Sequence, residues 1–481
     1  MVKYILHMHS DRMSQQSRYN QALNFIQQTV ETEELGYIYT FPDKRLYRPV
    51  ADTNTFIKNA WKNYEGSICL YVHVPFCTPK LMPEDVKKLM EKKHIPLDGR
   101  DYLCAYCNLF TTPTHKVPSQ FTQILIKEIE MYRRIFKDKK LTAASLYFGG
   151  GTPSLLTAYE LKTIREALVT LVGDFPDNIE QALECSPDSV DREKLQAVHE
   201  SGFNRLSIGV QTFNKQVLHY LGRNYDPMVG YEAIKIALEV GFCNVNGDLI
   251  VGLPFSTENI FFHDLDLMIE LNPQTITLYQ DMTRPLTRFG KMKDHGILPS
   301  VSSKEIYAWV DKANTKLKKN GYVRKTLTCW LKKDGGYQQG EDIYKQIPLL
   351  GFGPGARSYG PYAHYDTDYA VASNKVNSVI ANWLLAIKNG KHPKISGFKI
   401  TKDIQRRRDV ILGLMSENGI INKNAAQFFQ PELKALIDTK LVTIKNGTYH
   451  YTEKGKSRSG ALSKLFFGEK ILKSLQRYEH K

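Results

Sequence analysis

Three cysteines take the spacing of metal ligands once an interrupting segment between them is set aside. Cys77 is followed by Thr-Pro-Lys, but the run Cys104-Ala-Tyr-Cys107 begins only after a further 23 residues, 81–103. Removing that segment joins Lys80 to Cys104 and restores a C-x3-C-x2-C motif. Iron–sulfur clusters are held by cysteine thiolates, usually four of them. Three cysteines directly after an apolar strand-like run therefore predict ligands for three irons of a [4Fe–4S] cluster, with one iron open to a small molecule.

A glycine-rich segment, GGGTPS at 149–154, follows a predicted strand and precedes a predicted helix. Glycines let a backbone approach a ligand closely, and exposed N–H groups favour an anionic or carbonyl partner. A phosphate-binding P-loop is excluded, because no Gly-Lys-Ser/Thr follows. Alone, the segment predicts only a tight turn. Its position one strand–helix unit after the cysteines favours a ligand-binding role.

Alternating strands and helices must position these residues. From residue 68 to about 282, short apolar runs alternate with helical patterns, as in strand–helix units of a parallel sheet. A capping box at Thr157–Glu160 predicts a helix through Val172, and a second helix over 191–201 ends before Gly202. Six units are too few to close an eight-stranded barrel, so the sequence predicts an α/β fold with an open, partial (β/α)6 barrel. The predicted strands are 68–74, 144–149, 179–185, 204–211, 245–253 and 274–282.

The rest of the chain divides into three further predicted regions. Residues 1–67 are a polar N-terminal extension before the barrel, which spans 68–300 and contains the 81–103 insertion. Residues 301–400 form an accessory α/β region that completes the active site. In 401–481, helical stretches lead into a run in which Asn-Gly predicts a tight hairpin, so this part is predicted to be a winged-helix-like domain.

Taken together, the motifs resemble the radical S-adenosylmethionine (SAM) superfamily and, within it, the oxygen-independent coproporphyrinogen III oxidase family. The resemblance spans roughly residues 68–470. In this superfamily SAM binds the open iron and is cleaved to methionine and a 5′-deoxyadenosyl radical. The segments that carry the resemblance are YVHVPFC…CAYC, YFGGGTPS, ECSPD, RLSIGVQTFN, LGR, DLIVGLP, LNP and GFGPGARSY.

The resemblance assigns roles to residues around the cluster. It implies that Cys77, Cys104 and Cys107 hold the cluster and that Tyr71 and Tyr106 lie against SAM. The residues implied to hold the methionine or ribose portions of SAM are Gly150, Gly151, Thr152 and Glu184.

Family members of this kind can bind a second SAM, which would contact Gln211, Arg223 and Asp248. An Arg facing a carboxylate and a carboxylate facing an amine are chemically reasonable pairs. The alternative is that Glu184, Gln211 and Asp248 are polar residues at strand ends that cap neighbouring loops. Their shared position at carboxyl ends of strands, where barrel active sites form, favours the binding role.

Two departures from the family pattern leave the reaction open. Leu109 stands where true coproporphyrinogen dehydrogenases have a further cysteine, and 337–346 lacks the HNxxYW motif of the heme-chaperone branch. The segment typical of heme-degrading methyltransferases is also missing. The resemblance therefore implies a radical SAM enzyme that abstracts hydrogen from an organic substrate, for which a tetrapyrrole suits the basic charge. A methyltransferase with a second SAM and a non-catalytic heme-binding relative are the alternatives.

The interrupting segment has its own helix and turn signals. Pro83 and two acids, followed by lysines, suit a helix over 82–94. Val86, Leu89 and Met90 share one face of that helix. The longer loop costs on the order of 2 kcal/mol in loop closure. Because its charges balance and its apolar face is small, we expect a surface excursion beside the cluster that can be deleted without loss.

A zinc site is the main alternative without radical chemistry. The three cysteines with His73 or His94 could form a Cys3His site, since C-x2-C is a common zinc half-site. The accompanying motifs favour the cluster, and His73 is expected to be a strand histidine beside it. The remaining cysteines, expected to be buried apolar residues, are Cys69, Cys185, Cys243 and Cys329.

Composition and charge limit the class of protein to which the chain can belong. The chain has 481 residues, 42% of them hydrophobic and 24% charged, as in ordinary soluble proteins. No run approaches 18 apolar residues, the start lacks a signal-peptide pattern, and seven cysteines suit a reducing compartment, so a cytoplasmic location is predicted. Residues 401–481 hold 16 Lys and Arg against 8 Asp and Glu, out of a net charge of +15.

The expected partners follow from charge and from the resemblance. A basic tail can attract nucleic acid, but it lacks an aromatic stacking pattern, so nucleic acid is not the expected partner. The expected partners are a small-molecule substrate and, as the resemblance implies, a reductase or a flavodoxin- or ferredoxin-type electron donor.

Overall fold

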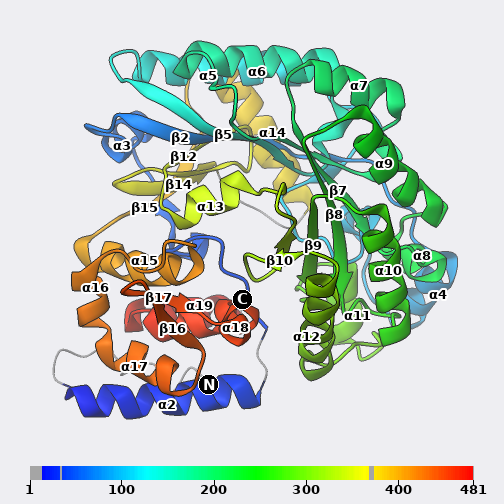
Figure 1. The fold of residues 1–481 in the computed structure, drawn as a ribbon. Coiled ribbons are helices and arrows are strands. Elements are labelled where there is room, and N and C mark those ends of the chain that lie inside the picture. The colour runs from blue at the N-terminus through cyan, green and yellow to red at the C-terminus, as the bar shows by residue number, and fades with distance from the viewer. Residues whose placement is uncertain (1–12, 33–34, 368–372, 480–481) are drawn as a thin grey trace.

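The structure, a computed structural model, describes residues 13–32, 35–367 and 373–479. Its centre is a parallel sheet that contains every predicted strand, with bounds that differ from the prediction by no more than three residues (Figure 1). Neighbouring strands in this sheet pair in parallel, as strand–helix units require. The strands are β2 (Gly66–Val74), β5 (Leu141–Gly150), β6 (Gln181–Cys185), β7 (Arg205–Gln211), β8 (Asn244–Val251) and β9 (Thr275–Gln280).

Helices connect these strands and cover the outer face of the sheet (Figure 1). The predicted capping box at Thr157 is present: its side chain accepts from Glu160 N, and the Glu160 side chain accepts from Thr157 N. Gly202 follows the helix that begins after Asp191 and has φ +95°, as predicted. The helices are α5 (Phe121–Ile135), α6 (Ala158–Val172), α7 (Arg192–Glu200), α8 (Lys215–Leu221), α9 (Pro227–Val240) and α10 (Glu258–Leu271).

The sheet extends beyond the six predicted strands at both edges and does not close. One further parallel strand, β12 (Leu349–Phe352), pairs with β2, and the other added strands are antiparallel. The sequence analysis did not predict these strands, which are two to five residues long. The order is β1-β15-β14-β13-β12-β2-β5-β6-β7-β8-β9-β11-β10. The added strands are β1 (Arg48–Pro49), β13 (Arg357–Tyr359), β14 (Ala363–Thr367), β15 (Ile395–Lys399), β11 (Cys329–Leu331) and β10 (Val323–Arg324).

Smaller elements fill the space around the sheet. A two-strand pair, β3 with β4, carries the first cysteine of the motif. Of the four cysteines expected to be buried, Cys69, Cys185 and Cys329 are buried, but Cys243 is exposed. The smaller elements are α3 (Thr53–Ala60), β3 (Phe76–Cys77), α4 (Glu84–Lys92), β4 (Thr112–Pro113), α11 (Arg288–Asp294), α12 (Ser303–Lys319), α13 (Gln338–Tyr344) and α14 (Ser373–Lys388).

The C-terminal region begins with helices and a hairpin in the predicted order. Asn446 and Gly447 have φ +50° and +77°, which a tight hairpin turn with two left-handed residues requires. The winged-helix assignment itself stays a prediction, since two further helices follow the hairpin. The elements are α15 (Lys402–Met415), α16 (Lys423–Phe428), α17 (Gln430–Asp438), β16 (Val442–Lys445), β17 (Thr448–Tyr451), α18 (Glu453–Leu462) and α19 (Glu469–Glu479).

The described part of the N-terminal extension does not form a separate unit. Its helix α2 (Gln15–Glu31) packs along the C-terminal helices (Figure 1), with Phe25 and Ile26 in their apolar core. Arg18 Nη2 lies 2.8 Å from Glu432 Oε2, a carboxylate with no exposed surface. The segment is therefore amphipathic rather than simply polar.

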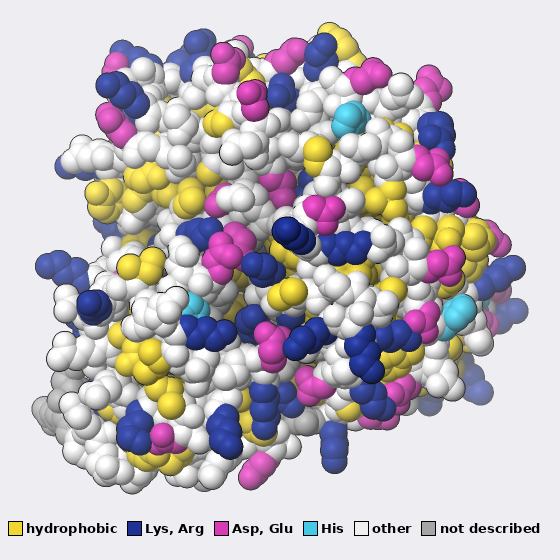
Figure 2. Space-filling model, in the orientation of Figure 1, with side chains coloured by type: hydrophobic (Ala, Val, Ile, Leu, Met, Phe, Trp, Pro, Cys, Tyr) yellow, Lys and Arg dark blue, Asp and Glu magenta, His cyan; other side chains and the backbone are white. Residues whose placement is uncertain are grey.

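Charged side chains are distributed unevenly over the surface. A band of Lys and Arg crosses the middle of the face in Figure 2, between the helices of the barrel and those of the C-terminal region. Within the described residues, no helix is both long and apolar enough to cross a membrane.

Candidate functional site

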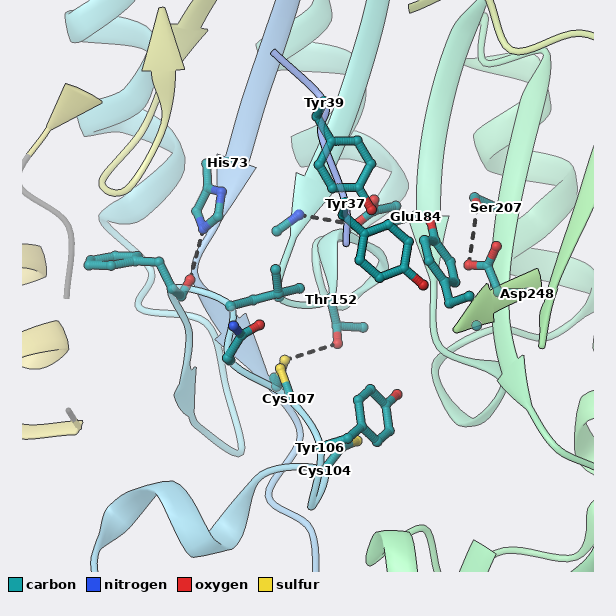
Figure 3. A pocket seen from close by; sticks show the side chains of 18 of the residues that line it. Tyr37, Tyr39, His73, Cys104, Tyr106, Cys107, Thr152, Glu184, Ser207 and Asp248 are labelled. Atoms are coloured by element: carbon teal, nitrogen blue, oxygen red, sulfur yellow. Dashed lines mark hydrogen bonds between the residues drawn. The ribbon is translucent and has the colours of Figure 1, made fainter. Parts of the chain in front are cut away.

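A cavity of about 650 Å³ lies at the carboxyl ends of the parallel strands. All twelve residues predicted from the sequence line it, and Figure 3 shows the cysteine loop facing the carboxylates across the opening. Long-range folding therefore brings together residues that are up to 177 positions apart in the sequence. The twelve are Tyr71, Cys77, Cys104, Tyr106, Cys107, Gly150, Gly151, Thr152, Glu184, Gln211, Arg223 and Asp248.

The first cysteine is held by two hydroxyl groups. Cys77 lies at the end of β3, and its Sγ accepts from Thr111 Oγ1 at 3.2 Å and from Thr152 Oγ1 at 3.4 Å. The glycine loop and the cysteine loop thus share a contact at this sulfur.

The second and third cysteines lie in a tight turn braced by two helices. Cys107 N donates to Cys104 O at 2.9 Å, which closes the turn. Between them, Ala105 N donates to Leu221 O at the end of α8, and Ala105 O accepts from Phe289 N in α11. The turn is therefore fixed by barrel elements that lie more than 100 residues further along the chain.

The three thiols differ in electrostatic environment. Burial raises the pKa of Cys77 and raises that of Cys107 to about 12. Burial acts in the same direction at Cys104, but the charges of Arg223 and Lys80 outweigh it and hold the pKa of that thiol below its usual value. Metal binding requires the thiolate, so iron would have to displace protons from Cys77 and Cys107.

The geometry does not support the zinc alternative. Both ring nitrogens of His73 are engaged, Nε2 with Phe110 O at 2.8 Å and Nδ1 with Tyr71 OH at 3.0 Å. His94 is exposed at the end of α4 and does not line the cavity. Among the described residues, no three His, Cys, Asp or Glu side chains gather closely enough to hold one metal ion. A cluster differs in this respect, because each cysteine binds a different iron.

The glycine loop lies directly against the cysteine strand. A Cβ on Gly151 would lie 2.5 Å from Phe76 O, and Gly150 has φ +111°, so side chains are excluded at both positions. The N–H groups of Gly150, Gly151 and Thr152 all donate within the protein. Their acceptors are the Glu184 carboxylate and the carbonyl oxygens of Val74 and Phe76, so the expected anionic or carbonyl partners belong to the protein itself. The loop instead offers close approach and carbonyl oxygens, which suit an ammonium group.

Glu184 is the carboxylate next to this loop. Its Oε1 accepts from Tyr147 OH at 2.9 Å and its Oε2 accepts from Gly150 N at 3.0 Å. Burial raises the pKa of this carboxyl to about 7, although both hydrogen bonds oppose that shift. Each oxygen keeps a further lone pair, with which a ligand can be bound.

A second polar group lies at the next strand ends. Gln211 ends β7 with φ +73°, a strained conformation for a residue other than glycine. Arg223 is buried beside it; Nη1 donates to Gly209 O and Tyr225 OH, while Nε has no hydrogen-bond partner among the described residues. Buried polar atoms without partners are rare, and this one indicates room for a ligand or water.

Asp248, on β8, faces the same space. Its Oδ1 accepts from Asn246 Nδ2 at 2.7 Å, and Ser207 Oγ lies 3.5 Å from Oδ2. Burial raises the pKa of this carboxyl to about 6, even though Asn246 opposes the shift.

Sequence reasoning missed the contribution of the N-terminal segment. Tyr37 and Tyr39 line the cavity with their rings nearly parallel, 6.0 Å apart, and Tyr37 OH donates to Gln280 O at 2.8 Å (Figure 3). Lys44 also lines it, and burial lowers the pKa of its amine to about 6. The run YIYTFPDKRLYRPV is rich in Tyr and basic residues, but nothing in it indicates where it packs.

The cavity fits the cofactors that the motifs imply. Thiolates suit iron, the two carboxylates suit ammonium or hydroxyl groups, and Arg223 suits a carboxylate. Gln280, at the end of β9, is 3% exposed and neither side-chain polar atom has a partner in the described part of the chain. A ligand with both donors and acceptors, as SAM has, would satisfy such an amide.

The 81–103 insertion is more closely integrated than predicted. Lys80 N donates to Tyr102 O at 2.8 Å, so the excursion leaves and returns at one point. Val86 and Met90 are buried in an apolar cluster with residues of α8 and α11, although Leu89, the third predicted face residue, is 37% exposed. The segment lies outside the main barrel core, as expected, but it is not a loose surface excursion.

Comparisons with known proteins support the same fold. Residues 98–268 match the model of the radical SAM superfamily, a range that includes Cys104 and Cys107. The coproporphyrinogen III oxidase (HemN) from Escherichia coli, a radical SAM enzyme, has a similar structure, with a TM-score of 0.72 and 22% identity over 89% of this chain and 96% of that one.

Curated relatives cover most of the chain. The heme chaperone HemW of Bacillus subtilis is 25% identical over 421 residues, 83% of this chain and 99% of the relative. The oxygen-independent coproporphyrinogen III oxidase of Helicobacter pylori is 24% identical over 405 residues, 81% of this chain and 82% of the relative. The chain therefore contains a radical SAM domain and is homologous to the family of HemW heme chaperones and oxygen-independent coproporphyrinogen III oxidases.

Proposed function

We propose that this chain is a radical SAM enzyme that cleaves SAM reductively at a [4Fe–4S] cluster and removes a hydrogen atom from an organic substrate. The observation that carries the proposal is the shared cavity. Three cysteines from two segments, the glycine loop and Glu184 all line it. No ligand simpler than a cluster with SAM requires three thiols together with a glycine loop and a buried carboxylate.

In this proposal Cys77, Cys104 and Cys107 hold the cluster. When bound, the cluster and SAM supply one-electron chemistry and the 5′-deoxyadenosyl radical. The protein itself binds the cluster and SAM and orients them. The carbonyl groups of the Gly150–Thr152 loop and the Glu184 carboxylate receive the ammonium or hydroxyl groups of SAM, and Tyr71 and Tyr106 shield it from water.

Gln211, Arg223 and Asp248 form the second binding region. Arg223 suits a carboxylate, and Asp248 suits an amine or hydroxyl group. A second SAM or the substrate itself could occupy this region. Arg357, which also lines the cavity, supports a substrate with carboxylates, such as a tetrapyrrole with propionates. A flavodoxin- or ferredoxin-type protein or a reductase would deliver the electron.

A heme-binding role is the second candidate. It is favoured by relatives named as heme chaperones, one of which aligns along 99% of its length with this chain. The tyrosine-rich cavity supports a flat ligand as well as SAM. In that case heme would bind without being changed.

Product analysis separates these candidates. We expect the anaerobically reconstituted protein, given dithionite and SAM, to form 5′-deoxyadenosine. Cys107→Ser should abolish the product, and Cys243→Ser, at an exposed cysteine outside the cavity, should leave it unchanged. S-adenosylhomocysteine formed in addition indicates methyl transfer. A cluster-loaded protein that forms no deoxyadenosine but gives a Soret band with hemin would contradict the enzymatic proposal.

A further inference from the structure

One arginine of the insertion holds the loop that carries two of the three cysteines. Arg100 is 2% exposed, and its Nη2 donates to Cys107 O and to Leu109 O, each at 2.8 Å. Its Nη1 lies 3.5 Å from Thr111 O. A guanidinium has five donors in a fixed planar fork, so one side chain can fix several carbonyl groups at once.

These carbonyl groups belong to the segment that follows Cys107 and passes beside Cys77. Residues 107–111 run from the third cysteine to Thr111, whose hydroxyl donates to Cys77 Sγ at 3.2 Å. Arg100 therefore contacts both ends of the stretch that sets where Cys107 lies relative to Cys77. No other side chain of the insertion has hydrogen bonds to this stretch among the described residues.

Within the described residues, Arg100 forms no ion pair. Asp98 and Asp101, the acids on either side of it, form ion pairs with Lys291 of α11, with Nζ–O distances of 3.2 and 2.7 Å. A buried charge without an opposite charge nearby is unfavourable. A guanidinium group is a cation in proteins, and that of Arg100 contacts the carbonyl group of Cys107, a residue of the cavity wall. A cluster with three thiolates is an anion and would balance that charge.

The rest of the insertion anchors Arg100 to the barrel. Arg288 Nη1 donates to Asp101 O at 3.1 Å, and Lys291 Nζ donates to Pro96 O at 3.2 Å. Val86 and Met90 of α4 pack in an apolar cluster with residues of α8 and α11. The arginine is thus fixed from both sides of its turn.

We propose that residues 81–103 are a working part of the cluster site in this chain, and that Arg100 is a positioning residue. It holds the Cys104–Cys107 loop in place and offsets the negative charge of the cluster. The proposal rests on the proposed function, because it requires that the three cysteines bind a cluster. Reduction adds one electron, and hence one negative charge, so the cation stabilises the reduced form more than the oxidised form.

Variants of Arg100 in the full chain test the proposal. Arg100→Met removes the charge and the fork, Arg100→Lys keeps only the charge, and Lys88→Met changes an exposed lysine of the same insertion as the matched control. Each is reconstituted anaerobically with iron and sulfide. The measurements are iron and sulfide per chain, the rate of iron loss to a chelator, the midpoint potential by EPR titration, and the melting temperature without iron.

We expect Arg100→Met to lose iron about tenfold faster than wild type, as is typical when the partner of a metal ligand is removed. Its midpoint potential should be more negative. Arg100→Lys should keep a potential close to that of wild type but lose iron faster, because an ammonium group cannot bridge two carbonyl groups. Lys88→Met should match wild type in its midpoint potential and in its rate of iron loss.

Two results would overturn the proposal. One is a folded Arg100→Met protein with the iron retention and potential of wild type. If Arg100→Met does not fold, the decisive result is Arg100→Lys losing iron no faster than Lys88→Met. A wild-type chain that takes up no cluster at all contradicts the proposed function, and this inference with it. A loaded wild type with an unaffected Arg100→Met contradicts the inference alone.

Discussion

Glu184 shows how one buried carboxyl group can control ligand binding. Two donors, Tyr147 OH and Gly150 N, hold its oxygens, but burial is the larger effect and raises its pKa to about 7. The group therefore changes charge near neutral pH. A carboxyl that binds an ammonium group must be ionised, so its protonation competes with ligand binding.

We expect the affinity for SAM to fall as the pH drops below 7. The sign follows from the raised pKa: below it Glu184 is protonated and cannot pair with a cation, and each pH unit should cost up to about tenfold in affinity. Calorimetry on the reconstituted protein between about pH 6 and 7.5 measures the slope. Glu184→Gln should weaken SAM binding, remove the pH dependence of the affinity and leave the iron content intact. Glu166→Gln, at the surface, is the control and should keep the pH dependence. A slope that persists in Glu184→Gln would return Glu184 to a purely structural role.

The residues that sequence could predict are those within recognisable motifs. Cys77 and Glu184 follow short apolar runs, so their positions at strand ends could be derived, whereas Asp248 lies in the middle of β8. Tyr37 and Arg100 could not be placed, because neither lies in a motif: Tyr37 lines the cavity and Arg100 contacts the Cys107 carbonyl group only through tertiary packing.

Elements with strong local signals were predicted well, and elements set by packing were not. The parallel strands and the Asn446-Gly447 hairpin follow from alternation and turn residues. The two- and three-residue strands at the sheet edges carry no such pattern and form only against neighbours. In α4, the helix itself was predicted, but its burial against α8 and α11 depends on residues more than 100 positions away.

Deleting 81–103 and joining Lys80 to Cys104 should therefore destabilise the protein, contrary to the expectation from sequence. The deletion exposes the apolar side chains of α8 and α11 that Val86 and Met90 cover. Burial of one such side chain contributes about 1.5–3 kcal/mol, so a loss of a few kcal/mol is expected. Denaturant unfolding of the iron-free protein measures it. A deletion variant as stable as wild type, with equal iron retention, would show that the segment is dispensable.

At the scale of the whole molecule, the N-terminal segment contacts both the C-terminal helices and the barrel cavity. Arg18 pairs with Glu432 across more than 400 residues of sequence, and Tyr37 and Lys44 from the same N-terminal segment line the cavity. Local patterns could indicate neither contact, because both depend on how distant segments pack. The substrate would therefore meet a wall to which the N-terminal segment contributes beside the barrel strands.

The most direct test of the central claim is the metal content and spectrum of the anaerobically reconstituted full chain. We predict about four irons and four sulfides per chain, with an EPR signal of the reduced cluster that changes when SAM is added. The EPR signal should be lost in each of three variants, Cys77→Ser, Cys104→Ser and Cys107→Ser. It should remain in Cys243→Ser. Zinc without sulfide in protein purified and reconstituted anaerobically, or a cluster that survives all three substitutions, would contradict the account.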